Sequence, residues 1–193
     1  MSILLEVQRW LKEKMDENLY HHSIASSELA VEIARRYKAD EEKAQIAALI
    51  HDCAKIYSPK ELLDFAKAFN IQLDDIEKEN PSLLHALIGV DIFEKAFGTV
   101  HSSIKRAVRL HTTGDANMEI LDKVIYVSDS LEPNRHYPGL IQIREIARRD
   151  LDYSLYMILQ RKIQHSMESR KQIHPRVLST WNWIIPLIKT KKY

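Results

Sequence analysis

The stretch Ile50-His51-Asp52-Cys53-Ala54-Lys55 places a histidine and an aspartate side by side at the end of an alanine-rich apolar run. A neutral imidazole nitrogen and a carboxylate oxygen together suit a borderline divalent metal, and few structural roles require both at one point. The alternative is a helix-end aspartate that is hydrogen-bonded to its histidine neighbour. Taken alone, the pair leaves both interpretations equally open.

The chain has 193 residues, enough for one domain with a sizeable core. Its 28 Lys and Arg residues balance 27 Asp and Glu residues, so the overall charge does not favour a nucleic-acid polymer as partner. The single cysteine excludes an intramolecular disulfide, and the sequence shows neither a secretion signal nor an apolar stretch long enough for a bilayer. We therefore expect a cytoplasmic protein without a membrane segment.

Apolar residues recur at steps of three and four almost throughout, and the chain contains only four glycines and six prolines. This is the period of the α-helix, so we expect an all-α helical bundle. Leu5, Trp10 and Leu11 are expected to face inward, and the acidic stretch after residue 69 is expected to be a loop. The expected helices cover about 4–15, 19–37, 40–50, 59–69, 82–97, 102–112, 117–131, 140–148, 151–170 and 174–183.

We expect a single domain over residues 1–193. No repeat, low-complexity tract or long linker divides the chain. Its metal-binding core should lie at about 20–135, with the carboxy-terminal helices at 140–190 packed on it.

Helical position selects among the nine histidines. His22 shares a face with small and apolar residues such as Ala25 and Leu29, whereas His21 shares its face with Glu28 and Glu32. His22 is therefore expected to point inward and His21 to face solvent.

His85 and His111 also lie on apolar faces, each in a separate expected helix. Gly89 follows His85 one turn later, where a glycine costs about 1 kcal/mol relative to alanine. Such a glycine indicates that another segment approaches closely. Any one of these histidines alone is more often a core residue than a ligand, but together with His22 and His51 they form a set.

Asp129 lies at the end of an expected helix, on its inner face. Burying a carboxylate is costly without a cation, and the carboxyl end of a helix is the unfavourable end for a negative charge. A metal would compensate both effects, although an exposed last-turn aspartate is the equally open alternative. Asp115 and Asp122 are expected to be ordinary solvent residues.

Imidazole and carboxylate donors together favour iron, manganese or zinc over magnesium, because nitrogen ligands discriminate against hard ions. Lys55 follows His51 by about one turn and Arg135 lies in the loop after Asp129, so both can reach a phosphate near such a metal. The alternative for either residue is a solvated surface cation.

The ordered set His22, His51-Asp52 and Asp129 resembles the metal-binding pattern of the HD superfamily of phosphohydrolases. The match extends to Leu84-His85-Ala86 and to the segments 111–114, 128–135 and 173–175, which resemble the YqeK family of bacterial symmetrical diadenosine tetraphosphate hydrolases. Two positions depart from that family, the residues before His22 and the serines flanking Asp129. They leave the four-residue pattern intact and affect the expected shape of the pocket.

The resemblance implies an all-helical HD domain that binds iron, with manganese or zinc as alternatives, and cleaves a dinucleoside tetraphosphate into two nucleoside diphosphates. It implies that the metal ligands are His22, His51, Asp52 and Asp129. A second metal at His85 and His111 is left open, as is a homodimer.

The resemblance also implies roles in the reaction. Asp52 or Asp129 would orient the water, and His85 or His111 would protonate the leaving oxygen. The implied catalytic set is Asp52, His85 and His111. The implied nucleotide contacts are His22, Lys55, His85, His111, Thr112, Asp129, Arg135, Ile173 and His174.

Two other functions use the same residues. Another HD-type nucleotide phosphohydrolase, such as a nucleotidase or a deoxynucleoside triphosphate hydrolase, would keep the four ligands and change the pocket walls. A non-catalytic nucleotide-binding regulator is disfavoured by the intact ligand set, because such a protein does not need all four residues to fold.

Overall fold

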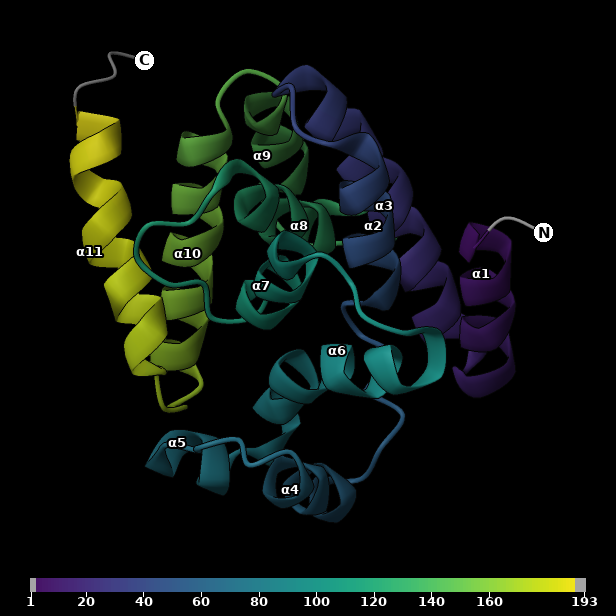
Figure 1. Cartoon of the computed structure of the whole chain (residues 1–193). Coiled ribbons are helices and arrows are strands. Elements are labelled where there is room, and N and C mark those ends of the chain that lie inside the picture. Colours follow the sequence, from purple (N-terminus) through teal and green to yellow (C-terminus); the bar gives the residue numbers. More distant parts are fainter. Residues whose placement is uncertain (1–2, 190–193) are drawn as a thin grey trace.

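The computed structural model describes residues 3–189, which form α-helices and one short 3-10 helix, η1, and contain no strand. The expectation of an all-α protein is therefore confirmed. In chain order (Figure 1) the elements are α1 (Ile3–Lys14), α2 (Glu17–Arg36), α3 (Glu41–Ile50), α4 (Pro59–Ala68), α5 (Asp75–Glu79), η1 (Pro81–Leu83), α6 (Leu84–Phe97), α7 (Ser102–Leu110), α8 (Ile120–Leu131), α9 (Leu140–Ala147), α10 (Leu151–Glu168) and α11 (Pro175–Lys189).

Side-chain caps define the starts of the helices before and after the His-Asp pair. Asp40 accepts a hydrogen bond from the Lys43 backbone N–H at 3.0 Å, which satisfies a free amide of α3. At α4, Ser58 and Glu61 form a reciprocal capping box, and Pro59 occupies the first turn. The helix starts that the sequence predicts near Asp40 and at Pro59 are confirmed.

Three local expectations are wrong. The acidic stretch after residue 69 contains α5, because Asp74 and Glu77 cap each other's backbone amides at 2.8 and 3.0 Å. Leu5 is 54% exposed, since it lies on the side of α1 opposite to the buried residues Val7 and Leu11.

The last helix continues through Pro186 to Lys189 instead of ending at Trp183. A proline removes one intrahelical hydrogen bond, to the carbonyl four residues earlier. Here that carbonyl belongs to Asn182, and both residues are exposed, so water can take the missing partner's place.

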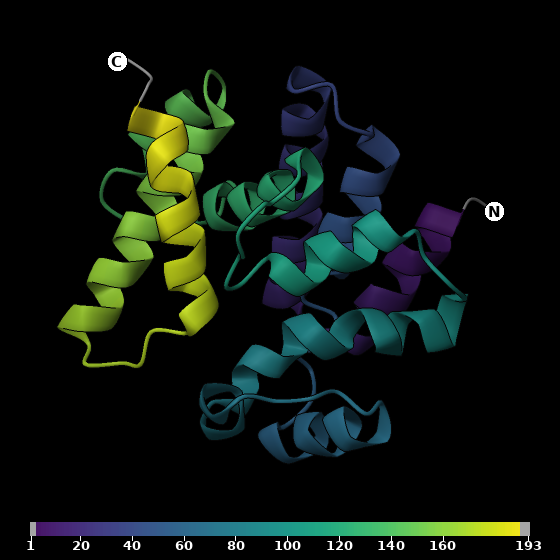
Figure 2. The same cartoon turned by 60° about the vertical axis from the view of Figure 1, so that its left-hand side comes forward.

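Helix α8 is the centre of the fold, with nine of its twelve residues buried. Helices α2, α3 and α7 pack around one part of it and α10 around another, so residues from Val7 to Ile184 share one apolar core. Figures 1 and 2 show α10 and α11 side by side, across the molecule from α1. The parts expected at about 20–135 and 140–190 thus contact each other, while the boundaries we assigned to them stay a prediction.

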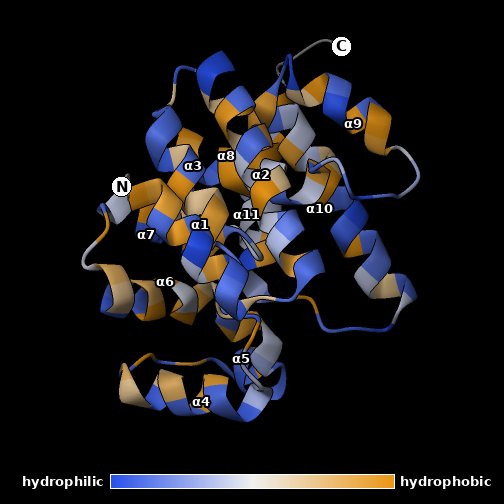
Figure 3. Cartoon of the chain, turned by 90° about the vertical axis from the view of Figure 1, so that its right-hand side faces the viewer, coloured by the Kyte–Doolittle hydropathy of each residue, from blue (hydrophilic) through white to orange (hydrophobic). Residues whose placement is uncertain are grey.

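A second, smaller apolar cluster joins α4 and α6, with Leu62, Leu84 and Ile88 at its centre. Ala54, just after the His-Asp pair, also belongs to it. Figure 3 shows α4 and α5 together below α6, with hydrophobic and hydrophilic residues on different sides of α4. Within residues 3–189, none of the helices combines the length and apolar character that crossing a bilayer requires.

Gly89 lies where the sequence predicts a close approach. The Cys53 thiol donates to the Gly89 carbonyl oxygen at 3.2 Å, and burial raises the pKa of this thiol to about 12. A β-carbon at Gly89 would lie 3.4 Å from Cys53 Sγ and 3.7 Å from Ala54 Cβ. The glycine therefore brings α6 against the segment that carries His51 and Asp52.

Changes at Gly89 should separate helix propensity from packing. Gly89→Ala adds a methyl group that fits in ordinary contact and should preserve or raise stability by up to about 1 kcal/mol. Gly89→Leu overfills the contact and should destabilise the fold by about 1–3 kcal/mol. Urea unfolding followed by circular dichroism measures both changes, and equal stability of the leucine and alanine variants would contradict the close packing.

Candidate metal centre

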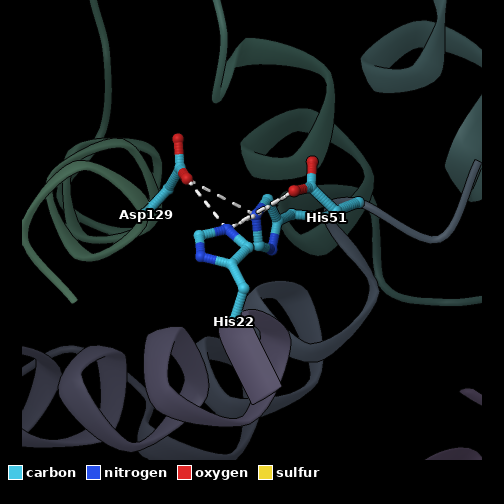
Figure 4. Close-up of side chains that lie close together, drawn as sticks. His22, His51 and Asp129 are labelled. Atoms are coloured by element: carbon cyan, nitrogen blue, oxygen red, sulfur yellow. Dashed lines mark hydrogen bonds and ion pairs between the residues drawn. The ribbon is translucent and has the colours of Figure 1, made fainter. Parts of the chain in front are cut away.

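Four side chains from three parts of the chain converge on one point. His22 comes from α2, the His51-Asp52 pair follows α3, and Asp129 lies in the last turn of α8. His22 Nε2 lies 3.2 Å from His51 Nε2, 3.2 Å from Asp129 Oδ1 and 3.4 Å from Asp52 Oδ2. Figure 4 shows the His22 and His51 rings and the Asp129 carboxylate pointing toward one another.

The hydrogen bonds of the two rings determine which nitrogen is free. His51 Nδ1 donates to the Ala48 carbonyl oxygen at 2.6 Å, and His22 Nδ1 donates to Glu132 Oε1 at 3.2 Å. Both partners are acceptors, so in the neutral rings Nδ1 carries the hydrogen and Nε2 keeps its lone pair. Two lone pairs that face each other at 3.2 Å need a positive charge between them.

His85 and His111 form a second group on the other side of Asp52. Their Nε2 atoms lie 3.2 Å apart, and 3.4 and 3.3 Å from Asp52 Oδ1. His111 Nδ1 donates to the Val108 carbonyl oxygen at 2.6 Å, and His85 Nδ1 donates to that of Ser82. Asp52 therefore bridges two ligand groups, with Oδ2 facing one and Oδ1 the other.

The site fits a divalent cation. Asp52 Oδ1 is buried and accepts no hydrogen bond within the described residues, as expected for an oxygen reserved for a metal. Burial alone would raise the pKa of Asp52 and Asp129, but the neighbouring imidazoles hold both pKa values well below the usual range. Both carboxylates are thus ionised, and His22, His51, Asp52 and Asp129 together supply mixed nitrogen and oxygen donors.

The imidazoles differ in protonation when only protein groups surround them. Burial lowers the pKa of His111 to about 4. Burial also opposes a charge on His51, yet the Asp52 and Asp129 carboxylates raise its pKa to about 10. The pKa of His22 is raised as well, because the same two carboxylates outweigh its burial. A proton on His51 thus balances the negative charge of Asp52 and Asp129. A bound divalent cation would take over this role.

Glu132 is a site residue that the sequence reasoning missed. It is 2% exposed and orients His22, while its other carboxylate oxygen accepts from the Asn134 backbone N–H at 2.6 Å. The sequence places Glu132 in the matched segment 128–135 but assigns it no role. The available signal was a second carboxylate near Asp129 at the unfavourable end of the same helix.

Lys55 and Arg135 both lie beside candidate metal ligands. Lys55 Nζ donates to Asp52 Oδ2 at 2.6 Å, and Arg135 Nη2 donates to Asp129 Oδ1 at 2.8 Å. Their side chains are 39% and 42% exposed, so each cation has one face on the site and one on solvent. Their proximity to the centre is established, while their contact with a phosphate stays a prediction.

Thr112, Ile173 and His174 lie together along a cavity of about 600 Å³ between α10, η1 and the loop before α11. The His174 ring turns away from the metal centre. Its Nδ1 accepts from the Arg176 backbone N–H at 3.1 Å, so Nε2 carries the hydrogen and faces Asp74 Oδ2 at 3.0 Å. His174 Nε2 thus lies against the start of α5, 3.0 Å from Asp74 Oδ2 and 3.5 Å from Glu77 Oε1.

Two further expectations about single residues are settled by burial. His21 is exposed, as predicted from its helical face. Asp122 is buried, which contradicts the expectation of a solvent residue, because it accepts from the Glu119 backbone N–H at 2.8 Å and lies 3.2 Å from Arg106 Nη2. It caps α8 and lies apart from the metal centre.

Comparisons with known proteins agree with this geometry. Residues 19–134 match the HD domain family. The chain is 34% identical over 175 residues to a symmetrical bis(5'-nucleosyl)-tetraphosphatase of Bacillus subtilis, covering 91% of this chain and 94% of that protein. It is 33% identical over 175 residues to a protein of the same name from Halalkalibacterium halodurans, with coverage of 91% and 93%.

A crystal structure from Clostridium acetobutylicum, described as a predicted HD superfamily hydrolase involved in NAD metabolism, is similar to this chain in fold. The TM-score is 0.93 at 31% identity, over 97% of this chain and 99% of that chain. The similarity therefore includes the carboxy-terminal helices as well as the helices that carry the candidate metal ligands.

Removing the Glu132 carboxylate should weaken metal binding without removing a ligand. Glu132→Ala should lower metal affinity by about 10–100-fold, because His22 loses the partner that orients its ring, and Glu132→Gln should lower it less. Competition with a chelator measures the affinity. Glu145→Gln changes an exposed carboxylate on α9 and serves as the control. Wild-type affinity in Glu132→Ala would contradict this role.

Proposed function

Because the chain belongs to the HD-domain family and to its YqeK branch, we propose that it is a metal-dependent hydrolase that cleaves dinucleoside tetraphosphates symmetrically. The observation that carries this proposal is the convergence of four imidazole Nε2 atoms on the two oxygens of Asp52. The substrate is inferred from the relatives that are named symmetrical tetraphosphatases.

The proposed reaction adds one water across the central phosphoanhydride of the substrate. A bond forms between the water oxygen and one of the two central phosphorus atoms, the bond from that phosphorus to the bridging oxygen breaks, and both halves leave as nucleoside diphosphates. A bound divalent cation supplies charge neutralisation on the phosphate oxygens and lowers the pKa of a bound water.

The metal would be held by His22, His51, Asp52 and Asp129, and Glu132 would orient the His22 ring. Asp52 or Asp129 would also orient the attacking water. The mixed donors support iron, manganese or zinc, with iron favoured by the family resemblance.

His85 and His111 would face the phosphates or hold a second metal together with Asp52. One of the two would protonate the leaving oxygen when no second metal is bound. Both rings are buried and their Nδ1 atoms are held by backbone carbonyls, so each presents a single nitrogen to the centre.

Lys55 and Arg135 would stabilise the expelled nucleoside diphosphate. Each is already paired with a ligand carboxylate, at 2.6 and 2.8 Å, which fixes its position before the substrate arrives. Arg135 can offer a bidentate fork to a phosphate, and Lys55 a point charge. Thr112 and the Ile173-His174 backbone would contact the nucleotide in the cavity of about 600 Å³.

The remaining expectations stay predictions. They are a cytoplasmic location, a small-molecule partner without a nucleic-acid polymer, and an assembly state that includes a homodimer as one possibility.

A substrate panel tests the proposed function. The metal-loaded protein should convert diadenosine tetraphosphate into two molecules of ADP, as measured by chromatography of the products. Turnover of mononucleotides and deoxynucleoside triphosphates should be much lower. A clear preference for a mononucleotide would instead identify the chain as a nucleotidase-type HD phosphohydrolase, and no turnover of any nucleotide would favour a binding protein.

Asp52 should be required for both the metal and the activity. Asp52→Asn keeps the shape of the side chain but removes the negative charge that both groups of imidazoles face. Both kcat/KM and the amount of bound metal should fall by more than about a hundredfold, which exceeds the effect of losing a residue such as Glu132 that only orients a ligand. Far-ultraviolet circular dichroism should remain that of the wild type. Asp64→Asn alters an exposed carboxylate on α4 and is the control. Normal metal content in Asp52→Asn would refute the model of the site.

A further inference from the structure

The substrate of the proposed function carries a nucleoside at each end of one tetraphosphate. Cleavage at its centre requires the middle of the tetraphosphate to lie at the metal centre, so the two nucleosides must extend from that point in two directions. A site that holds the whole substrate therefore needs two nucleoside-binding regions. This requirement rests on the proposed function.

Two cavities lie along the same part of α10. The larger one, of about 600 Å³, includes Thr112, which directly follows His111. The smaller one, of about 270 Å³, includes the metal ligand Asp129. Lys162 and His165 line both cavities, so the two are neighbours that share one wall.

The smaller cavity offers the groups that bind a base and its ribose. Ile158 supplies a buried apolar surface, and Tyr137 supplies an aromatic ring. Arg161 Cζ lies 4.1 Å from the centre of the Tyr137 ring, so the guanidinium is held over the ring. Aromatic rings and guanidinium planes are the surfaces on which nucleotide bases stack.

The charge of this wall suits a polyphosphate. Lys162 Nζ lies 3.9 Å from the centre of the buried Tyr126 ring, a contact that positions the ammonium without neutralising it. Within residues 3–189, none of Arg161, Lys162 and His165 lies within ion-pair distance of a carboxylate. The positive charge of Arg161 and Lys162 thus remains available to an anion.

A third cavity, of about 690 Å³, shows the contrast. It is lined by Lys105, Arg106 and Arg109, but each of these cations is already paired. Lys105 lies 2.8 Å from Glu94, and Arg109 lies 2.7 Å from Asp91. This cavity is larger, yet none of the candidate metal ligands lines it.

We propose that the cavity of about 270 Å³ is the binding site of the second nucleoside of the substrate. Tyr137 and Arg161 bind its base, and Lys162 contacts the phosphate that leads from the metal centre toward it. The cavity of about 600 Å³ then holds the first nucleoside, and the shared wall of Lys162 and His165 lies beside the tetraphosphate between them.

Variants of the small cavity should discriminate between substrates with two nucleosides and with one. For the metal-loaded full chain, Arg161→Ala and Tyr137→Ala should each lower kcat/KM for diadenosine tetraphosphate by about tenfold, the size of one lost base stack. The loss for adenosine 5'-tetraphosphate should be several times smaller, because its single nucleoside can occupy the larger cavity.

Matched controls accompany these variants. Tyr137→Phe keeps the ring and loses only the hydrogen bond from the hydroxyl to the Ser130 carbonyl oxygen, so its kcat/KM for diadenosine tetraphosphate should fall far less than that of Tyr137→Ala. Gln160→Ala changes the exposed neighbour of Arg161, which lines neither cavity, and should leave both activities unaltered. Arg161 is exposed, so its variant should fold even if Tyr137→Ala, which loses a hydrogen bond from the Tyr137 hydroxyl to the Ser130 carbonyl, does not.

Product binding gives a second measurement. Equilibrium dialysis of the metal-loaded wild type should find two ADP molecules bound per chain, and Arg161→Ala should bind one at the same ADP concentration. One ADP per wild-type chain, or equal losses for both substrates in the variants, would overturn the second-nucleoside site. Failure of the wild type to cleave diadenosine tetraphosphate would instead overturn the proposed function itself.

Discussion

Asp52 imposes the strongest constraint on this structure. Its side chain has no exposed surface, and its two oxygens face two different pairs of imidazoles. A buried carboxylate is stable only when positive charge and hydrogen-bond donors surround it, and breaking such a buried interaction typically costs about 3–5 kcal/mol. Helices α2, α6 and α7 and the end of α3 must therefore meet at this residue, and α8 completes the group with Asp129.

The ends of helices prepare the imidazoles for this role. The last carbonyls of an α-helix lack an intrahelical partner. His51 and His111 are the C-cap residues of α3 and α7, and each donates its Nδ1 hydrogen to the carbonyl three residues earlier, of Ala48 and Val108. The same local interaction thus directs Nε2 toward Asp52 in both helices.

Positively charged side chains surround the candidate metal centre. Lys55 and Arg135 neutralise the outer sides of Asp52 and Asp129, at distances of 2.6 and 2.8 Å. Beyond them α10 presents Arg161, Lys162 and His165, which lack carboxylate partners in the described part of the chain. Arg161 and Lys162 therefore provide uncompensated positive charge beside the two cavities, which suits a polyanionic substrate.

Features that depend on neighbours in the sequence were determined by the sequence itself. The helical period predicts the fold class, Asp40 and Pro59 mark helix starts, and the faces of α2 and α8 place His22 and Asp129 inward, because each property follows from spacing within a few turns. What spacing cannot provide is the partner on another helix. Only the tertiary structure decided that Glu132 orients His22 across 110 positions of the chain, that Arg106 helps bury Asp122, and that α10 forms the wall between two cavities. These contacts depend on which helix faces pack together. That packing is decided by the whole apolar core and cannot be inferred from the spacing of residues within one helix.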